Sequence, residues 1–219
     1  MSSNEYQKKL DTILQETQRN PAEHKPSLLL HACCGPCSSY TIEYLSKFFD
    51  IYVYYYNPNI YSPQEYERRL SELERFLGEF PPALECGVKL QKNEYIPQEF
   101  YEAIRIKEEP LLAEESEKGE RCRRCYEFRL KKAYAYAAEN GFDWFCTTLS
   151  ISPFKDADKI NTIGAALEQQ NPSGPKWLYS DFKKKGGFKR SLELSEQFNL
   201  YRQQYCGCVY SAKNRHGKE

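Results

Sequence analysis

The stretch "LLLHACCGPCS", from Leu28 to Ser38, joins a short apolar run to three closely spaced cysteines. The apolar run is typical of a buried strand. Pro36 is well placed to begin a helix, because the N–H group that proline lacks would be unpaired in the first helical turn anyway. The stretch therefore predicts strand, loop and helix. We expect Cys33 and Cys34 to end the strand and Cys37 to lie in the first turn of the helix.

The same alternation of strand and helix continues along the chain. Four further runs predict strands: "DIYVYYYNPN", "ALECGVKLQ", "WFCTTLSIS" and "KWLYSDF". Between and around them, helices are predicted at the N-terminus, after Ser62, from Arg121 to Glu139, from Ser152-Pro153 through Leu167, and over "SLELSEQFNLY". The helix after Ser62 has the clearest start, because Ser62 and Glu65 match a capping box.

Strands that alternate with helices predict an α/β fold, with a parallel sheet flanked by helices. Ligands of such folds bind beyond the carboxyl ends of the strands. We expect Cys33, Thr147 and Asp181 to lie near that edge of the sheet.

Length and charge limit the architecture and the partners. With 219 residues, the chain fits a single α/β domain over 1–219, with a helical insertion around 97–120. Its 31 basic and 31 acidic residues cancel, so a nucleic acid would have to bind a local basic patch. The first residues do not resemble a signal peptide and no apolar run has the length of a membrane span. We therefore expect a cytoplasmic protein without a membrane partner.

Seven of the nine cysteines fall into three groups. In a reducing compartment such grouping indicates metal binding or catalysis rather than structural disulfides. Cys34-Gly35-Pro36-Cys37 alone suggests a dithiol redox enzyme, but the adjacent Cys33 also favours a metal centre. Both interpretations of this group stay open from the residues alone. Cys86 and Cys146 lie in strand-like runs and are interpreted as packing residues.

The other two groups carry different chemistry. Cys122 and Cys125 are expected on one side of a helix, where they suit an iron–sulfur cluster or zinc, with positive charge from Arg121, Arg123 and Arg124 around them. Cys206-Gly207-Cys208 is too tightly spaced for a usual zinc site. A strained disulfide between Cys206 and Cys208 would be easily reduced, and the pair is therefore a catalytic candidate.

Three more features are candidates for RNA contact or packing. His31 is expected to be a buried, hydrogen-bonded side chain. The run "KKKGGFKR", from Lys183 to Arg190, is either a solvated loop or a phosphate-binding segment. Tyr55 and Tyr56 lie near a strand end, where they could stack on a base.

Four motifs in this order, "HACCGPCS", "RCRRCYEFRL", "TTLSISPFKD" and "YCGCVYS", resemble the cobalamin-independent epoxyqueuosine reductases of tRNA queuosine synthesis. The resemblance spans Leu28 to Ser211. It implies an adenine-nucleotide-hydrolase-like (HUP-like) fold in which the cysteine loop replaces a phosphate loop. It also implies reduction of an epoxide on a modified guanosine at the wobble position of tRNA.

The resemblance also implies a cofactor and site residues. It assigns a [4Fe-4S] cluster to Cys33, Cys34, Cys122 and Cys125, and a redox-active pair to Cys206 and Cys208. Cys37 is then left either for a second iron ion or for an activated thiol. Because reducing an epoxide to an alkene takes two electrons and a cluster ordinarily supplies one, we expect an external electron donor and a second redox group.

Two other function classes remain as alternatives. A thioredoxin-like dithiol oxidoreductase would use Cys34 and Cys37 but would leave the other paired cysteines without a role. A zinc-stabilised RNA-binding module would use the paired cysteines and basic residues without catalysis.

Overall fold

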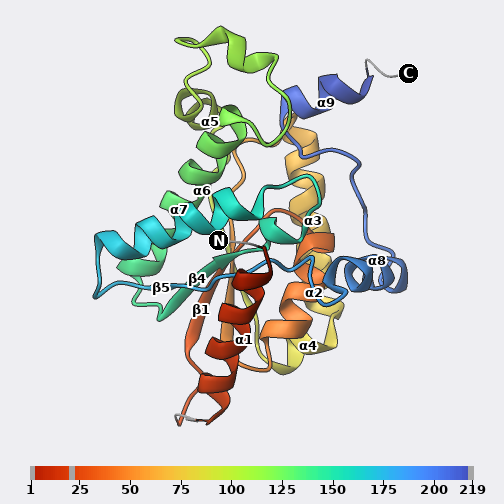
Figure 1. The fold of residues 1–219 in the computed structure, drawn as a ribbon. Coiled ribbons are helices and arrows are strands. Elements are labelled where there is room, and N and C mark those ends of the chain that lie inside the picture. The colour runs from red at the N-terminus through yellow and green to blue at the C-terminus, as the bar shows by residue number, and fades with distance from the viewer. Residues whose placement is uncertain (1–2, 20–22, 217–219) are drawn as a thin grey trace.

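The structure is a computed structural model that describes residues 3–19 and 23–216, and in it strands and helices alternate (Figure 1). The strands are β1 (Ser27–Ala32), β2 (Asp50–Tyr55), β3 (Lys89–Lys92), β4 (Trp144–Thr147) and β5 (Lys176–Trp177). The helices are α1 (Ser3–Arg19), α2 (Gly35–Leu45), α3 (Pro63–Glu79), α4 (Pro81–Glu85), α5 (Pro97–Ala103), α6 (Glu120–Glu139), α7 (Ala157–Gln170), α8 (Gly187–Gln197) and α9 (Val209–His216). Short 3₁₀ turns cover Pro110–Ala113 and Thr148–Ile151.

All five strands are parallel and lie in the order β3-β2-β1-β4-β5. The central strand β1 pairs with β2 on one side, where Leu28 faces Ile51, and with β4 on the other, where Leu28 faces Trp144. The order therefore reverses direction at β1, and ligands of open α/β sheets bind at such a switch point. The predicted α/β fold is confirmed, and the cysteine loop leaves β1 at this switch point.

Helices cover both faces of the sheet (Figure 1). Alternate residues of β1 point to opposite faces. Leu28 and Leu30 pack into a cluster with side chains of α2, α3 and α8, whereas Leu29 packs with side chains of α6 and α7. Because both faces are covered, β1 is apolar almost throughout, as is usual for a central parallel strand.

Several predicted boundaries are wrong in detail. The helix predicted from Ser152-Pro153 begins at Ala157, because the Asp156 carboxylate accepts hydrogen bonds from the amides of Asp158 and Lys159 at 3.0 and 3.1 Å. Strand β5 has only two residues, and the first part of "ALECGVKLQ" belongs to α4 rather than to a strand. Cys86 therefore follows a helix, where its thiol donates to the Ser46 carbonyl.

The start of α3 also differs from the prediction. The helix is present, but the Ser62 side chain makes no capping hydrogen bond. Glu65 instead pairs with Arg69 one turn later, with 2.7 Å between its Oε1 and the arginine Nε. Helix α9 had no counterpart in the sequence prediction. The single domain over 1–219 stays a prediction.

Candidate active site

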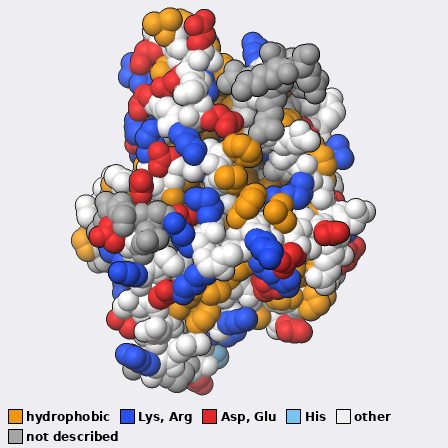
Figure 2. Space-filling model, turned by 45° about the vertical axis from the view of Figure 1, so that its right-hand side comes forward, with side chains coloured by type: hydrophobic (Ala, Val, Ile, Leu, Met, Phe, Trp, Pro, Cys, Tyr) orange, Lys and Arg blue, Asp and Glu red, His pale blue; other side chains and the backbone are white. Residues whose placement is uncertain are grey.

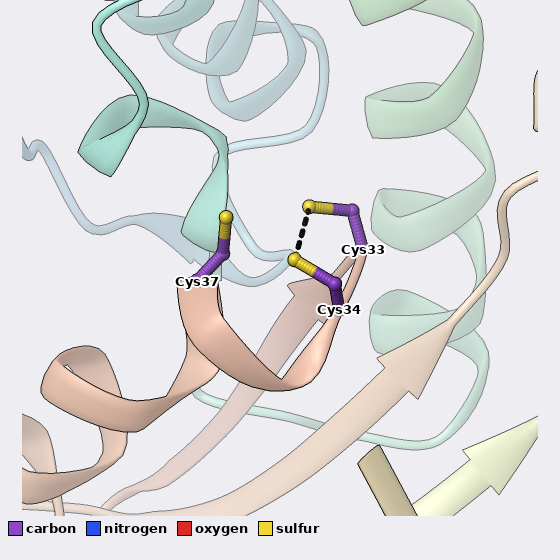
Figure 3. Close-up of side chains that lie close together, drawn as sticks. All are labelled: Cys33, Cys34 and Cys37. Atoms are coloured by element: carbon purple, nitrogen blue, oxygen red, sulfur yellow. Dashed lines mark hydrogen bonds between the residues drawn. The ribbon is translucent and has the colours of Figure 1, made fainter. Parts of the chain in front are cut away.

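Three thiols meet where β1 runs into α2 (Figure 3). The Sγ atoms of Cys33, Cys34 and Cys37 all lie within 4.8 Å of one another, and those of Cys33 and Cys34 are 3.8 Å apart. Cys34 is the residue before the helix and Cys37 lies in its first turn, as predicted. The tight strand-to-helix turn therefore gathers three metal-ligating groups.

Of the three thiols, Cys33 has the lowered pKa and is the one stabilised as a thiolate, whereas the pKa of Cys37 is raised. Hydrogen bonds from the Cys34 and Cys37 thiols hold the pKa of Cys33 well below its usual range. The same bond to Cys33 raises the pKa of Cys34 to about 12 and also raises that of Cys37. Cys33 is therefore the stabilised thiolate of the three, and Cys37 is a thiol that donates to it.

The C-terminal pair lies on the other side of the same pocket. Cys206 and Cys208 are free thiols, and Gly207 between them has φ +117°, a conformation that favours glycine. The Cys208 thiol, donating a hydrogen bond, holds the pKa of Cys206 well below its usual range, and Lys155 acts in the same direction. The Lys155 ammonium contacts the Cys206 sulfur directly. This pair thus contains a stabilised thiolate next to a protonated thiol.

Helix α6 carries the remaining pair between these two groups. Cys122 packs on the same apolar cluster as Cys33, whereas Cys125 shares a separate buried cluster with Cys208. Burial raises the pKa of Cys125 to about 11, and burial and the nearby charge of Cys206 also raise that of Cys122. The helix therefore spans the thiol groups, although its cysteines do not join the compact trio of Cys33, Cys34 and Cys37.

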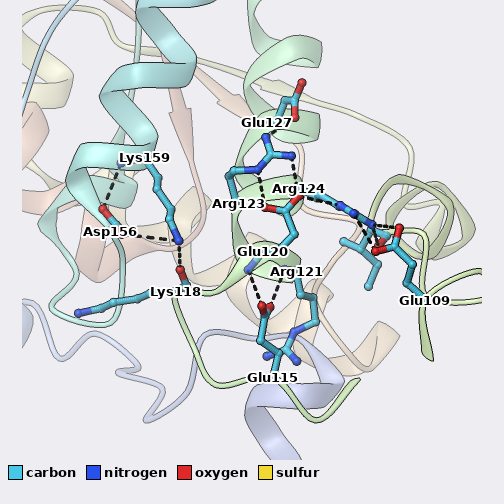
Figure 4. Close-up of polar contacts among 11 residues, drawn as sticks. Glu109, Glu115, Lys118, Glu120, Arg121, Arg123, Arg124, Glu127, Asp156 and Lys159 are labelled. Carbon is cyan, nitrogen blue, oxygen red and sulfur yellow. Dashed lines mark hydrogen bonds and ion pairs between the residues drawn. The ribbon is translucent and has the colours of Figure 1, made fainter. Parts of the chain in front are cut away.

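The arginines of "RCRRC" do not all act as predicted (Figure 4). Arg123 is held by Glu120 and Glu127, and Arg124 by Glu109 and Glu120, so their charges are neutralised by carboxylates. Only Arg121 turns inward, where it is buried. The expectation that all three arginines add positive charge around Cys122 and Cys125 is therefore wrong for two of them.

The Glu-rich segment before α6, residues 107–119, contacts this helix. The Glu115 carboxylate accepts hydrogen bonds from the amides of Glu120 and Arg121, each at 2.7 Å, and so caps the start of α6. Glu109 reaches Arg124 with its two oxygens at 3.0 and 3.1 Å. The predicted insertion thus holds the end of the helix that bears Cys122 and Cys125.

Buried positive charge surrounds the thiols. Arg121, Arg129 and Lys155 are buried, and within residues 3–19 and 23–216 no salt bridge joins any of them to a carboxylate. Arg69, also buried, pairs with Glu65 and donates to the Cys206 carbonyl at 3.2 Å. Among the residues that the structure describes, several guanidinium nitrogens have no hydrogen-bond partner: Nη2 of Arg69, Nε and Nη2 of Arg121, and Nε of Arg129. Buried cations need compensating negative charge, which thiolates or an anionic group bound to them would supply.

A pocket of about 640 Å³ opens onto these groups. Its walls bring together Cys33, Cys37, Lys155 and Cys206 with apolar and aromatic side chains, among them Leu149, Phe154, Phe188 and Tyr205. On the face that carries α8, hydrophobic side chains gather near the middle with Lys and Arg around them (Figure 2). The pocket therefore gives access to the thiols along a partly apolar wall.

Sequence reasoning missed two side chains of this pocket. Lys155 lies in "SPFKD", just beyond the carboxyl end of a predicted strand. That position alone could have identified it as a candidate, because ligands of α/β folds bind at this edge. The Gln203 amide donates to the Cys34 sulfur at 3.1 Å, but it sits in a loop whose sequence carries no signal. His31 is buried as predicted, bonded to Thr147 Oγ1 at 2.8 Å and to the Tyr56 carbonyl at 3.2 Å.

The predicted base-stacking role of Tyr55 and Tyr56 is wrong. Tyr55 has no exposed surface and Tyr56 is 4% exposed. The Tyr55 hydroxyl donates to the Tyr66 carbonyl, and the Tyr56 hydroxyl contacts Glu99. Both rings are therefore core residues.

The basic run from Lys183 is partly neutralised. Lys183 pairs with Asp181 at 2.7 Å, Lys185 pairs with Asp11 at 2.6 Å, and Arg190 pairs with Glu43 and Glu193. Phosphate binding by this run stays a prediction.

The parallel sheet flanked by helices, with the thiols at its switch point, is an α/β fold of the HUP-like class. A solved structure, the U34-tRNA thiolase NcsA from Methanococcus maripaludis with its [4Fe-4S] cluster, resembles the chain with a TM-score of 0.53. That similarity covers 94% of this chain and 68% of the thiolase at 13% sequence identity, and it supports the fold alone.

The sequence identifies the family. The family model described as "Epoxyqueuosine reductase QueH" matches residues 28–214. The protein of that name from Streptococcus pyogenes is 44% identical over 86% of this chain and 71% of its own length. Its namesake from Staphylococcus epidermidis is 40% identical over 94% of this chain and 84% of its own. The chain belongs to the epoxyqueuosine reductase QueH family, a family of oxidoreductases.

Proposed function

We propose that this protein reduces the epoxide of epoxyqueuosine at the wobble position of tRNA to the alkene of queuosine. Family membership supports the reaction class. The observation that carries the proposal is a single pocket in which Cys33, Cys37 and Cys206 meet among buried cations. A thioredoxin-like enzyme would need only one cysteine pair, and an RNA-binding module would need no pocket leading to free thiols.

The cofactor we propose is a [4Fe-4S] cluster, and the side chains fit a group of this kind. Thiolates are the usual ligands of such clusters, and a cluster with four thiolates is an anion that unpaired buried arginines would balance. We propose Cys33, Cys34, Cys122 and Cys125 as its ligands. Cys37 would then either bind a second iron ion or serve as an activated thiol. When bound, the cluster would supply electrons one at a time.

The residues around Cys206 would provide the rest of the reaction. Converting an epoxide into an alkene and water consumes two electrons and two protons. Oxidation of Cys206 and Cys208 to a disulfide releases two electrons and the proton of the Cys208 thiol. The second proton would come from Lys155 Nζ. The negative charge of Cys206, opposed by burial, raises the pKa of Lys155 well above its usual value. Losing that charge in the disulfide would therefore lower the pKa of Lys155 and free the proton.

Two partners and a location complete the proposal. The substrate is tRNA carrying epoxyqueuosine, and an external electron donor reduces the disulfide after each turnover. We place the protein in the cytoplasm, where thiols stay reduced. Within the described part of the chain, no helix has the length and apolar character to cross a membrane.

The test uses anaerobically purified protein and measures bound iron, bound sulfide and the nucleosides released from treated tRNA. We expect a brown protein that converts epoxyqueuosine to queuosine. Cys34→Ser and Cys122→Ser should lose most of the iron, because serine is a much poorer ligand than thiolate. Cys86→Ser is the matched control and should keep it. A colourless wild-type protein without conversion would overturn the proposal.

A further inference from the structure

A second, wider depression lies directly beside the pocket that holds the thiols. It is formed by the start of α3, the loop before it and α9, and its space, counted together with open solvent, is about 1190 Å³. Tyr205 lines both cavities, so the two adjoin at this residue.

The depression presents an aromatic ring to solvent. Tyr61 on its wall is 53% exposed, an unusual exposure for a large apolar ring. Its backbone is fixed, because the Tyr61 amide donates to the Gly207 carbonyl at 2.8 Å and the Tyr205 hydroxyl donates to the Tyr61 carbonyl at 3.4 Å. The two rings are therefore tied to the same turn that carries Cys206 and Cys208.

Positive charge lines the same depression. The Arg68 guanidinium lies 3.4 Å from the centre of the Tyr201 ring, and Arg68 and Lys213 are both exposed. In the described part of the chain no salt bridge joins either of them to a carboxylate. The one carboxylate on the wall, Glu65, is already taken by Arg69 and the Tyr201 hydroxyl. The surface is thus aromatic and cationic.

We propose that this depression binds the unpaired nucleotide next to the modified nucleotide of the tRNA. Its base would stack on Tyr61 and Tyr205, and its phosphate would contact Arg68 and Lys213. Proteins recognise single-stranded RNA by this combination of aromatic stacking and cationic contacts. The inference rests on the proposed function, because the shared Tyr205 wall places this nucleotide beside the one being reduced.

The experiment compares Tyr61→Leu and Arg68→Gln with Arg105→Gln, which changes an exposed arginine just after α5. The first readout is binding of an anticodon stem-loop RNA with 2-aminopurine next to the wobble nucleotide. Wild-type protein should change the 2-aminopurine fluorescence through stacking. Tyr61→Leu should abolish that change and weaken binding about tenfold, in line with the loss of one stacked base. Arg68→Gln should weaken binding and lower its salt dependence, whereas Arg105→Gln should bind as wild type.

The second readout is reduction of full tRNA, in which the loss should fall on KM. Because the fluorescence assay needs no cluster and no turnover, it tests the subsite even if no epoxide is reduced. Wild-type affinity in both Tyr61→Leu and Arg68→Gln would overturn the proposal. Normal RNA binding with slowed reduction by the electron donor would also overturn it, and would assign the depression to the donor.

Discussion

At the scale of single residues, the most informative contact is that between Lys155 and Cys206. A buried ammonium beside a sulfur stabilises the thiolate, and the thiolate in turn keeps the lysine protonated. Neither residue would hold its charge alone in a buried site. The pair therefore links the redox state of Cys206 to the protonation of Lys155.

We predict that Lys155→Met slows epoxide reduction by about 10²-fold or more, the range by which acid catalysis usually contributes. The affinity for tRNA should change little. Without the ammonium, the pKa of Cys206 rises, so a smaller fraction of Cys206 is thiolate at neutral pH. Alkylation of Cys206 in the cluster-free protein, followed by mass spectrometry of its peptide, should slow accordingly. Lys159→Met, which changes a more exposed lysine on α7, is the control. An unchanged alkylation rate in Lys155→Met would contradict the role given to this lysine.

A second prediction concerns the pair itself. Cys208→Ser should keep its colour and bind tRNA but fail in multiple turnover, because Cys206 alone cannot be oxidised to the disulfide whose formation releases the two electrons. Absorbance of the cluster and the number of queuosines formed per protein are the measurements. Bleaching in Cys208→Ser would instead make this residue a cluster ligand.

At the scale of elements, α6 is the helix on which the site depends most. It brings Cys122 and Cys125 between the other thiols and also contributes the buried Arg121 and Arg129. Its first turn is held from outside by the Glu115 carboxylate, which satisfies two amides that a helix start leaves unpaired. The position of Cys122 therefore depends on a segment that contributes no ligand.

We predict that Glu115→Ala lowers the free energy of unfolding by about 1 kcal/mol, as expected for the loss of a helix cap. Urea unfolding of the cluster-free protein measures it. Glu114→Ala changes the exposed neighbour and should leave the midpoint unchanged. Equal midpoints for both variants would show that the Glu115 carboxylate does not stabilise α6.

At the scale of the whole molecule, a chain with no net charge must bind RNA through a local surface. The run from Lys183 to Arg190 remains a candidate, but three of its cations already pair with carboxylates. Lys184 and Lys189 are the two lysines of the run without a salt bridge in the described part of the chain. The run follows strand β5, on the side of the sheet to which the strands' carboxyl ends point.

We predict that the double variant Lys184→Gln, Lys189→Gln weakens tRNA binding and lowers the salt slope by roughly one for each phosphate that the protein no longer neutralises. Lys47→Gln, at the opposite end of the sheet, should leave the slope unchanged. Iron content should be normal in both. A wild-type slope in the double variant would identify the run as a solvated loop.

The sequence predicted the fold well because the parallel sheet leaves strong local signals, such as the apolar run of β1 and the helical pattern of α6. It also placed Cys33, Cys34 and Cys37 together, because three cysteines within one turn must be neighbours. It could not predict that Lys155 meets Cys206. Lys155 and Cys206 belong to segments separated by 51 residues, and no local pattern shows that they meet. The pairs of Arg123 and Arg124 with Glu120 and Glu127, by contrast, are three or four residues apart on one helix, and their spacing could have been read from the sequence. Burial of Tyr55 and Tyr56 was missed because it depends on tertiary packing, of Tyr55 against Tyr66 on α3 and of Tyr56 against Phe128 on α6.

The central position of β1 also has a kinetic consequence for the newly made chain. Its partner β4 begins 116 residues further along, since Leu28 pairs with Trp144, and pairing over such a distance is slow because a long loop must close first. Until β4 and α6 dock, the thiols that follow β1 stay open to water and oxidants. Refolding in air should therefore trap wrongly cross-linked chains, whereas refolding without oxygen should not. The same pairing that builds the pocket makes an anaerobic or strongly reducing environment a condition for folding into it.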